Sequence, residues 1–350
     1  MSPARAAVLA VDGGNSKAEV TLVGEDGALL AIRRGPTISH QAVGLATGMV
    51  NLRALVAAAS VAAGLADPDR LRAVETRSTP PEAVADIGAY CLAGADYPSD
   101  EQLLEHAIEG LGLTREIVIR NDTLAALRAG THRPWGIALI CGQGINGAGV
   151  APDGRSARFD GLGDISGDWG GGGGIGVAAL GAAVRARDGR GPRTSLELLV
   201  PAHFGLRSTD ALTRALYTDR IDQRELSDLS PVVFHAAEAS DVVARQIVTR
   251  LAEELVTMAG ALIRRLRLAR LDPDVVLAGG VFRADDPAFY AAIEAGVAAV
   301  APRARVVRLT APPVLGAALI GLDRISRDRV TAPDVEARLR REMEKAVPVG

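Results

Sequence analysis

Residues 8–23 read Val-Leu-Ala-Val-Asp-Gly-Gly-Asn-Ser-Lys-Ala-Glu-Val-Thr-Leu-Val. An apolar run ends at Asp12, crosses a turn of small polar residues and resumes as an alternating apolar run, which predicts a β-hairpin with a polar tip. Gly13 and Gly14 would let backbone N–H groups approach an anion, Lys17 adds a positive charge, and Asp12 is placed to hold Mg²⁺. An ordinary hairpin turn is the second interpretation, because Asp, Gly and Asn are common turn residues.

The composition favours a two-domain α/β protein. The chain has 350 residues, of which 48% are hydrophobic and only 3% aromatic, so its cores must consist mainly of aliphatic side chains. The formal net charge is -3 and no basic run interleaves with aromatic residues, which argues against a nucleic acid partner. Two cysteines, Cys91 and Cys141, exclude a disulfide framework. Without a signal-peptide pattern or a long uninterrupted apolar run, we expect a cytoplasmic protein with no membrane partner.

Two further strands are predicted to end near carboxylates. Residues 87–96 read as a buried strand and a turn that ends at Asp96, and residues 116–122 read as a strand that ends at Asp122. A helix is predicted between them, and strand, helix, strand indicates a parallel unit. Ligands of such sheets lie at the carboxyl ends of the strands. Asp122 precedes a short helix, so it is either a helix cap or a residue that takes part in chemistry, and we favour the second interpretation.

A second hairpin repeats the logic of the first. Residues 135–150 give an apolar strand, the tip Gly142-Gln143-Gly144 and another strand. Because the two patterns lie about 130 residues apart, they predict an internal duplication with a phosphate-facing tip in each half.

The glycine-rich stretch 160–176 contains five consecutive glycines, Gly170–Gly174. We interpret it as a mobile loop, or as backbone that closely approaches a ligand, because such a run cannot build a core. Asp168 precedes the run, and the helix expected from about Val177 would turn its N-terminus toward an anion. A flexible linker between domains is the alternative.

Residues 177–270 are expected to be helical with a few breaks, and residues 274–282 read as a strand that ends in Gly279-Gly280. A base or ribose would fit against this diglycine, although a simple strand-to-helix turn explains it equally well. The segment 75–85, rich in proline and charge, is expected to be a surface excursion.

Taken in this order, the features resemble the superfamily of sugar kinases, heat-shock ATPases and actin. The more specific resemblance is to the BadF/BadG/BcrA/BcrD ATPase family, to which eukaryotic-type N-acetylglucosamine kinases belong. It extends from residue 8 to about residue 325, and its most specific parts are residues 11–17, 120–122 and 161–170.

The resemblance implies an α/β fold of two ribonuclease H-like (actin-like ATPase) domains with a nucleotide and sugar cleft between them. The first domain is expected at residues 1–120, and the helix 325–345 is a candidate for completing it. The second domain, with a helical insertion, is expected at residues 121–324.

The implied activity is ATP-dependent phosphorylation of the 6-hydroxyl of an amino sugar, with N-acetylglucosamine as the expected acceptor, Asp122 as the base, and Mg²⁺. Leu162 and Ser39 stand where the family has tryptophan and asparagine, so the sugar stays open among N-acetylglucosamine, glucosamine, N-acetylmuramic acid and glucose. Two other classes stay open as well, an activator ATPase with a shared iron–sulfur cluster and a sensor ATPase. We also expect a homodimer.

The predicted site residues fall into three groups. They are, for the nucleotide, Gly13, Gly14, Asn15, Ser16, Lys17, Gly142, Gln143, Gly144, Gly279 and Gly280; for the sugar, Ser39, His40, Asp96, Asp122, Gly161, Leu162, Gly163 and Asp168; and for the metal, Asp12.

Overall fold

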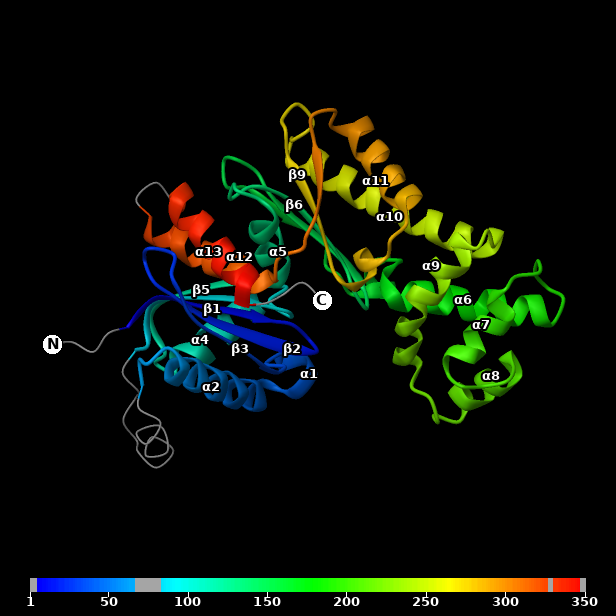
Figure 1. Cartoon of the computed structure of the whole chain (residues 1–350), viewed down its shortest axis with the longest axis horizontal. Coiled ribbons are helices and arrows are strands. Elements are labelled where there is room, and N and C mark those ends of the chain that lie inside the picture. The colour runs from blue at the N-terminus through cyan, green and yellow to red at the C-terminus, as the bar shows by residue number, and fades with distance from the viewer. Residues whose placement is uncertain (1–4, 67–82, 327–329, 347–350) are drawn as a thin grey trace. The chain divides into compact units, whose positions relative to one another are not determined.

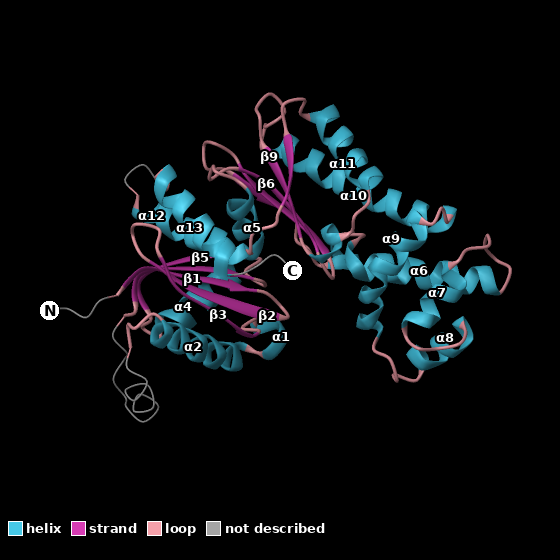
Figure 2. Cartoon of the chain, in the orientation of Figure 1, coloured by secondary structure: helices cyan, strands magenta, loops and turns pink. Residues whose placement is uncertain are grey.

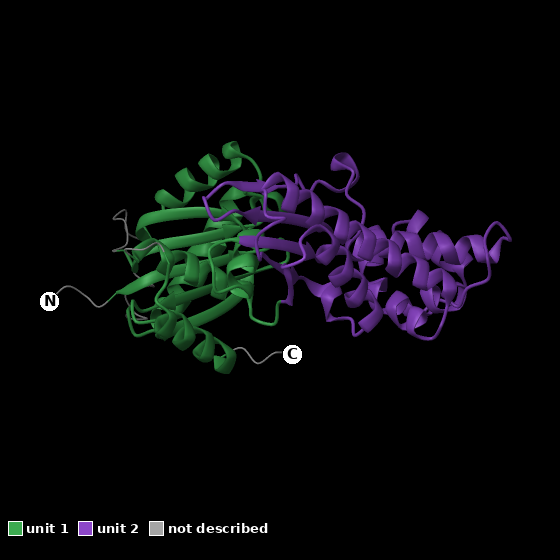
Figure 3. Cartoon of the chain, turned by 90° about the horizontal axis from the view of Figure 1, so that it is seen from above, with its two compact units in different colours: residues 1–135, 309–350 green, residues 136–308 purple. Residues whose placement is uncertain are grey.

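The computed structural model describes residues 5–66, 83–326 and 330–346. The chain forms two compact units, shown in different colours in Figure 3: unit 1 comprises residues 1–135 and 309–350, and unit 2 comprises residues 136–308. Most of the predicted surface excursion, residues 75–82, lies outside the described residues.

Unit 1 is built on a five-stranded sheet in the order β3-β2-β1-β4-β5 (Figure 1). Strand β1 pairs antiparallel with β2, whereas β1, β4 and β5 run parallel to one another. The predicted hairpin and the predicted parallel strand–helix–strand unit are therefore confirmed. The strands are β1 Ala6–Gly13, β2 Lys17–Val23, β3 Leu29–Pro36, β4 Ala85–Leu92 and β5 Thr114–Asn121.

Helices cover both faces of this sheet because successive side chains of a strand point to opposite faces. Leu9 and Val11 of β1 lie in the core under α2 and α4, and Val8 and Ala10 lie in the core under α5, α12 and α13. Figure 2 shows α2 on one side of the sheet and α12 and α13 on the other. The helices are α1 His40–Val43, α2 Leu45–Ala62, α4 Pro98–Glu109, α5 Asp122–Gly130, α12 Pro313–Ile325 and α13 Pro333–Ala346.

Among the described residues, α2 is long and apolar enough to cross a membrane by length and composition. Its Leu52, Leu55, Val56 and Ala59 lie in the core of unit 1, against the sheet. We therefore interpret α2 as a core helix, because the core of a large domain needs long apolar helices as much as a membrane does.

The two compact units differ from the predicted domain ranges, because α5 and α12 lie in unit 1. The physical reason is their close packing. A Cβ atom at Gly316 of α12 would overlap the backbone carbonyl of Ala125 in α5, so the two helix backbones nearly touch. Leu339 and Met343 of α13 also lie in the core of unit 1.

Unit 2 contains a second five-stranded sheet, in the order β10-β9-β6-β7-β8. Strands β6 and β7 form an antiparallel hairpin, and β6, β9 and β10 run parallel, so the order and the strand directions repeat those of unit 1. This repetition supports the predicted duplication, and the second hairpin is confirmed. The strands are β6 Gly136–Cys141, β7 Ile145–Val150, β8 Ser156–Arg158, β9 Asp274–Ala278 and β10 Arg305–Arg308.

Helices fill the long connection from β8 to β9, as the sequence predicts. Only the short strand β8 was not anticipated, because three residues carry too little pattern to identify a strand. The elements of this connection are the 3₁₀ turn η1 Gly163–Ser166, α6 Gly171–Arg187, α7 Leu196–His203, α8 Thr209–Tyr217, the 3₁₀ turn η2 Gln223–Leu229, α9 Ser230–Glu238 and α10 Val242–Arg265. Between β9 and β10 lie the 3₁₀ turn η3 Gly280–Arg283 and α11 Pro287–Val300.

Candidate active site

Three carboxylates gather at the carboxyl ends of neighbouring parallel strands in unit 1. Asp12 lies near the end of β1, Asp96 follows β4, and Asp122 follows β5. Asn121 binds one of them and caps the next helix: its Nδ2 donates a hydrogen bond to Oδ1 of Asp96 at 2.9 Å, and its Oδ1 accepts one from the backbone N–H of Thr123 at 3.1 Å. Asn121 is therefore the N-cap of α5, which leaves the carboxylate of Asp122 available for another role.

The pKa values of two of these carboxylates are raised. Burial raises the pKa of Asp12 to about 8, the charges of Asp122 and Glu19 add to the rise, and Lys17 opposes it. Burial and then the charge of Asp96 raise the pKa of Asp122 to about 6, against a lowering effect of the hydrogen bond from the Thr123 backbone. Shifts of this kind, caused by burial and crowded like charge, are typical of functional sites.

Glu19 is a member of this carboxylate group that the sequence did not reveal. It pairs directly with Asp12 across β1 and β2 and is only 4% exposed. Its Oε1 accepts a hydrogen bond from Nε of Arg34 at 2.6 Å and lies 3.8 Å from Nζ of Lys17, whereas its Oε2 has no partner among the described residues. The hairpin register is the signal that identifies Glu19, since residues directly opposite each other share one face of the sheet.

The first hairpin tip is held by the chain segment that follows β3. The hydroxyl of Thr37 donates to the Gly14 carbonyl at 2.7 Å, and the hydroxyl of Ser39 donates to Oδ1 of Asn15 at 2.7 Å. Ser16 and Lys17 stay exposed. Ser39 is only 3% exposed, and its hydroxyl contacts the tip through Asn15. Its contact with the sugar stays a prediction.

His40 faces the loop that carries Asp96. A Cβ atom at Gly94, which has φ 82°, would lie 2.8 Å from Cε1 of His40, so the ring packs against this loop. The Nδ1 atom of His40 is buried without a hydrogen-bond partner in the described part of the chain. A buried ring nitrogen without a partner is costly, which is consistent with a polar ligand at this position.

In unit 2, the glycines of the second tip lie in open space. A Cβ atom at Gly142 or at Gly144 would meet no described atom within 4 Å, and Gln143 is exposed. Gly280 is open in the same way. At Gly279, by contrast, φ is 115° and a Cβ atom would overlap the backbone of Cys141, so packing alone explains this glycine.

The prediction of a mobile loop or linker at Gly170–Gly174 is wrong, because α6 begins at Gly171. The N–H groups of Gly172 and Gly173 donate to the carbonyls of Gly142 and Gln143 at 2.7 and 2.8 Å. These N–H groups bind the second tip, and a Cβ atom at Gly172 would lie 2.5 Å from the Ser227 carbonyl. The sequence analysis proposed that these glycines let the backbone approach a ligand closely. In the structure they let it approach the backbone of the second tip and of Ser227.

The remaining predicted sugar residues lie in the loop before α6. Gly161 has φ 68°, and a Cβ atom there would overlap the Asn146 side chain. Leu162 is 41% exposed, and a Cβ atom at Gly163 would meet nothing within 4 Å. Oδ2 of Asp168 accepts a hydrogen bond from the Ser166 hydroxyl at 2.5 Å, which orients the carboxylate. This group lies in unit 2, whereas Ser39, His40, Asp96 and Asp122 lie in unit 1.

Among the described residues, no group of three or more His, Cys, Asp or Glu side chains is arranged to enclose a metal ion. A single carboxylate such as Asp12 still suits Mg²⁺, which is usually bound by one or two carboxylates together with waters and substrate phosphates. Both cysteines are buried, Cys91 in β4 and Cys141 in β6. Burial raises the pKa of the Cys141 thiol to about 12 and that of Cys91 strongly, so neither is a ready thiolate ligand for a metal cluster.

Comparisons with known proteins show which family the chain resembles. Residues 9–321 match the model of the BadF/BadG/BcrA/BcrD ATPase family. The chain is 33% identical over 202 residues to the N-acetylmuramic acid/N-acetylglucosamine kinase of Clostridium acetobutylicum, covering 57% of this chain and 66% of that relative, which is just under two thirds of its length. It is 27% identical over 324 residues to the N-acetyl-D-glucosamine kinase of Dictyostelium discoideum, covering 90% of this chain and 97% of that relative.

A similar fold occurs in a crystal structure from Chromobacterium violaceum that carries the name "Putative N-acetylglucosamine Kinase". That structure is 22% identical, with a TM-score of 0.68, and the match covers 90% of this chain and 98% of the other. At this identity the likeness concerns the fold alone. Because the family model matches most of the chain, the protein belongs to the BadF/BadG/BcrA/BcrD ATPase family.

Proposed function

We propose that the protein is an ATP-dependent kinase that transfers a phosphoryl group to the 6-hydroxyl of an amino sugar, with N-acetylglucosamine as the first candidate. The observation that carries this proposal is the group of Asp12, Asp96 and Asp122 at the ends of three parallel strands. Membership of an ATPase family and the names of the two curated relatives support the nucleotide and the acceptor class.

Asp122 is the residue that would accept the proton of the sugar hydroxyl. Its position as the first residue of α5, after the cap Asn121, fixes its backbone while leaving its side chain available. A pKa of about 6 makes the carboxylate largely ionised at neutral pH and still a competent base. His40 and Asp96 would hold the other sugar hydroxyls in unit 1, and Gly161–Gly163 with Asp168 are the candidates in unit 2.

Phosphoryl transfer depends mainly on positioning and on neutralising charge at the phosphate oxygens. In unit 1, Gly13–Ser16 and Lys17 are the candidates for phosphate contacts. In unit 2, the candidates are Gly142–Gly144 and the open diglycine position Gly280. Asp12 would hold Mg²⁺, which when bound supplies positive charge to the phosphates. The raised pKa of Asp12 fits this role, because burial and then the charges of Asp122 and Glu19 disfavour a free carboxylate there, and a bound cation would offset both.

N-acetylmuramic acid is the second candidate acceptor, because the Clostridium relative is named for both sugars. Leu162, which is 41% exposed, supports acceptance of a different sugar, because it is smaller than the tryptophan of the family pattern. Glucosamine and glucose complete the set that should be compared.

An assay of sugar-dependent ADP release tests the proposal. We expect ADP release with at least one of N-acetylglucosamine, N-acetylmuramic acid, glucosamine or glucose, and formation of the 6-phosphate, which mass spectrometry and NMR would identify. Asp122→Asn should abolish turnover while nucleotide binding, measured by calorimetry, is retained. Asp210→Asn is the matched control, because Asp210 is an exposed carboxylate in the first turn of α8. Normal turnover in Asp122→Asn would refute the assignment of the base.

The two non-kinase classes give different results in the same preparation. An activator ATPase with an iron–sulfur cluster would be coloured and would hydrolyse ATP without sugar. The burial of Cys91 and Cys141 opposes that class. A sensor ATPase would bind a sugar without forming its phosphate.

We further propose a cytoplasmic location, which the use of ATP and the two buried free cysteines support. The expected homodimer stays a prediction, and light scattering of the purified protein would test it.

A further inference from the structure

A buried cluster of charges lies at the opposite end of α5 from Asp122. Arg128 is only 2% exposed, and its guanidinium binds both oxygens of Asp323 in α12, with Nε to Oδ2 at 2.8 Å and Nη2 to Oδ1 at 3.1 Å. Nη2 also donates to Oε2 of Glu336 in α13 at 2.8 Å. One side chain therefore connects α5 to two helices that come much later in the sequence, at separations of 195 and 208 residues.

A second arginine completes the attachment by binding the end of α5 itself. The last carbonyls of a helix have no partner within the helix. Here Nη1 of Arg340 donates to the carbonyl of Ala129 at 2.6 Å and Nη2 donates to that of Thr131 at 2.8 Å. Nε of Arg340 binds Oε1 of Glu336 at 2.8 Å, so the two arginines share this carboxylate. Burial by itself would raise the pKa of Glu336, but the hydrogen bonds from Arg128 and Arg340 outweigh it and hold this pKa below its ordinary value.

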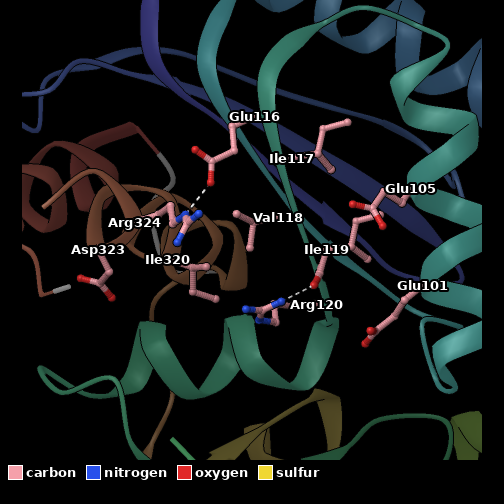
Figure 4. A pocket seen from close by; sticks show the side chains of 10 residues that line it. All are labelled: Glu101, Glu105, Glu116, Ile117, Val118, Ile119, Arg120, Ile320, Asp323 and Arg324. Atoms are coloured by element: carbon pink, nitrogen blue, oxygen red, sulfur yellow. Dashed lines mark hydrogen bonds and ion pairs between the residues drawn. The ribbon is translucent and has the colours of Figure 1, made fainter.

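The partner helix α12 is itself fixed to the sheet. Figure 4 shows Arg324 of α12 paired with Glu116 of β5 beside a pocket of about 430 Å³, with Asp323 on the neighbouring wall. On its other side α12 contacts α5 so closely that Gly316 admits no Cβ atom. Because Asp323 also accepts hydrogen bonds from the backbone N–H and the hydroxyl of Thr331, it cannot turn away from Arg128 without losing these partners.

We propose that Arg128 is a positioning residue for the phosphoryl transfer: it holds α5 against α12 and α13, and thereby fixes Asp122 at the other end of the same helix. This inference rests on the proposed role of Asp122. Helix α5 has only 9 residues, about 14 Å, and a helix of this length moves as a rigid body. A shift at its last turn is therefore passed on to its first residue, and a misplacement of about 1 Å can cost as much as 100-fold in rate.

The local hydrogen bonds of Asn121 do not replace this attachment. They fix the backbone of Thr123 and connect it to Asp96, but they act at one end of the helix only. A rigid body attached at one end can still tilt, and the tilt moves the carboxylate relative to the strand ends of β1 and β4. Attachment at both ends removes this freedom.

Nη1 of Arg128 also donates to the Thr131 carbonyl at 2.9 Å. Arg128→Lys is the test variant, because lysine keeps the charge but cannot bridge Asp323, Glu336 and this carbonyl with one planar group. Arg245→Lys is the matched control. Arg245 of α10 in unit 2 also binds a buried carboxylate on a neighbouring segment, Asp286, at 2.7 Å. For each variant we would measure kcat, KM for ATP and for the sugar, the nucleotide Kd, the melting temperature, and amide hydrogen exchange of residues 123–130.

In Arg128→Lys we expect kcat to fall by about 10-fold or more, with KM for ATP and nucleotide Kd within about twofold of the native values. Hydrogen exchange in residues 123–130 should rise by about 10-fold, whereas Arg245→Lys should change neither kcat nor this exchange. If Arg128→Lys does not fold, Glu336→Gln takes its place with the same expectations, because it weakens the same attachment from the α13 side.

Three results would overturn the inference. Unchanged exchange in residues 123–130 of a folded variant would show that Arg128 does not hold α5. Faster exchange with native kcat would show that holding α5 does not position the base. A kcat that falls equally in Arg245→Lys at equal melting temperature would likewise overturn it, since general loss of stability would then explain the effect. Failure of the proposed function is distinguishable, because the native protein itself would then phosphorylate none of the sugars while the exchange result still reports on the attachment.

Discussion

The Asp12→Asn substitution should make the metal-free and nucleotide-free protein more stable while it abolishes turnover. Asp12 shares the end of β1 with the charges of Asp122 and Glu19, and burial together with these charges raises its pKa from 3.8 to about 8. At pH 7 the folded protein therefore carries Asp12 mostly protonated, whereas the unfolded chain carries it ionised. Folding must take up a proton, and this lowers the free energy of unfolding. Asparagine is neutral in both states and avoids the cost.

The magnitude follows from the two pKa values. Each pH unit between them changes the free energy of unfolding by about 1.4 kcal/mol, so at pH 7 the limit is about 4 kcal/mol. Because Asp12 keeps partial contact with solvent, we expect a smaller effect, of roughly 1–3 kcal/mol. The raised pKa fixes the sign of this effect. The contribution of Asp12 to the free energy of unfolding is most favourable below about pH 4, where both states bind the proton, and it is lost as the pH rises toward 8. The advantage of Asp12→Asn over the native protein should therefore grow between pH 5 and pH 8.

Urea unfolding with EDTA at pH 5, 6, 7 and 8 measures the difference in the free energy of unfolding between Asp12→Asn and the native protein. The same series is then repeated with Mg²⁺ and ATP. Asp153→Asn is the control, because Asp153 is exposed and its pKa is lowered by hydrogen bonds from Arg155, which reverses the sign of any pH effect. With Mg²⁺ and ATP the native protein should gain stability and Asp12→Asn should gain less, as expected for a residue that holds the metal. An advantage that is independent of pH, or an Asp12→Asn protein less stable than the native one at pH 8, would refute the reasoning.

Three further predictions follow from single residues. The kcat of the kinase reaction should rise with pH through about 6, because Asp122 must be ionised to accept the proton, and a pH–rate profile whose acid limb lies near 4 would contradict the role of burial and Asp96. Gly176→Ala should destabilise the protein by about 2–4 kcal/mol in thermal unfolding, because a Cβ atom there would overlap the Leu226 carbonyl. Gly181→Ala in the same helix, where a Cβ atom meets nothing within 4 Å, should stabilise it by about 0.5–1 kcal/mol. The Cys141 thiol, whose pKa burial raises to about 12, should react with a thiol reagent at pH 8 only in urea, and rapid reaction of the native protein would show that the end of β6 opens.

The strands and most helices of this protein can be predicted from local pattern. The alternation of apolar residues along 8–23 gives both strands of the first hairpin, and the same pattern in residues 135–150 gives the second. Asp12, Asp96 and Asp122 could also be grouped from the sequence, because each follows a predicted strand and parallel strands bring their carboxyl ends to one edge of a sheet. Each strand assignment depends on residues close to it in the sequence, whereas the grouping of the three carboxylates depends on the general rule for parallel sheets.

The exceptions are residues whose partners lie far away in the sequence. The sequence does not show that the Ser39 hydroxyl contacts Asn15, nor that the Cys141 backbone requires a glycine at position 279. The ligand contacts predicted for these two residues stay predictions. The glycine run before α6 reads as a loop because its composition is unfavourable for a helix. In the folded protein, packing on the tip at Gly142 and Gln143 outweighs that propensity.

The sequence by itself determined the fold class, the two hairpins, the three strand-end carboxylates and, through its motifs, the family. Only the tertiary structure decided that Glu19 lies beside Asp12, that α5 and α12 belong to unit 1, and that the end of α5 is held by Arg128. The physical reason is the range of the interactions. Hydrophobic periodicity and turn chemistry act between near neighbours, whereas a buried ion pair between residues 128 and 323 exists only once the sheet has brought distant helices together.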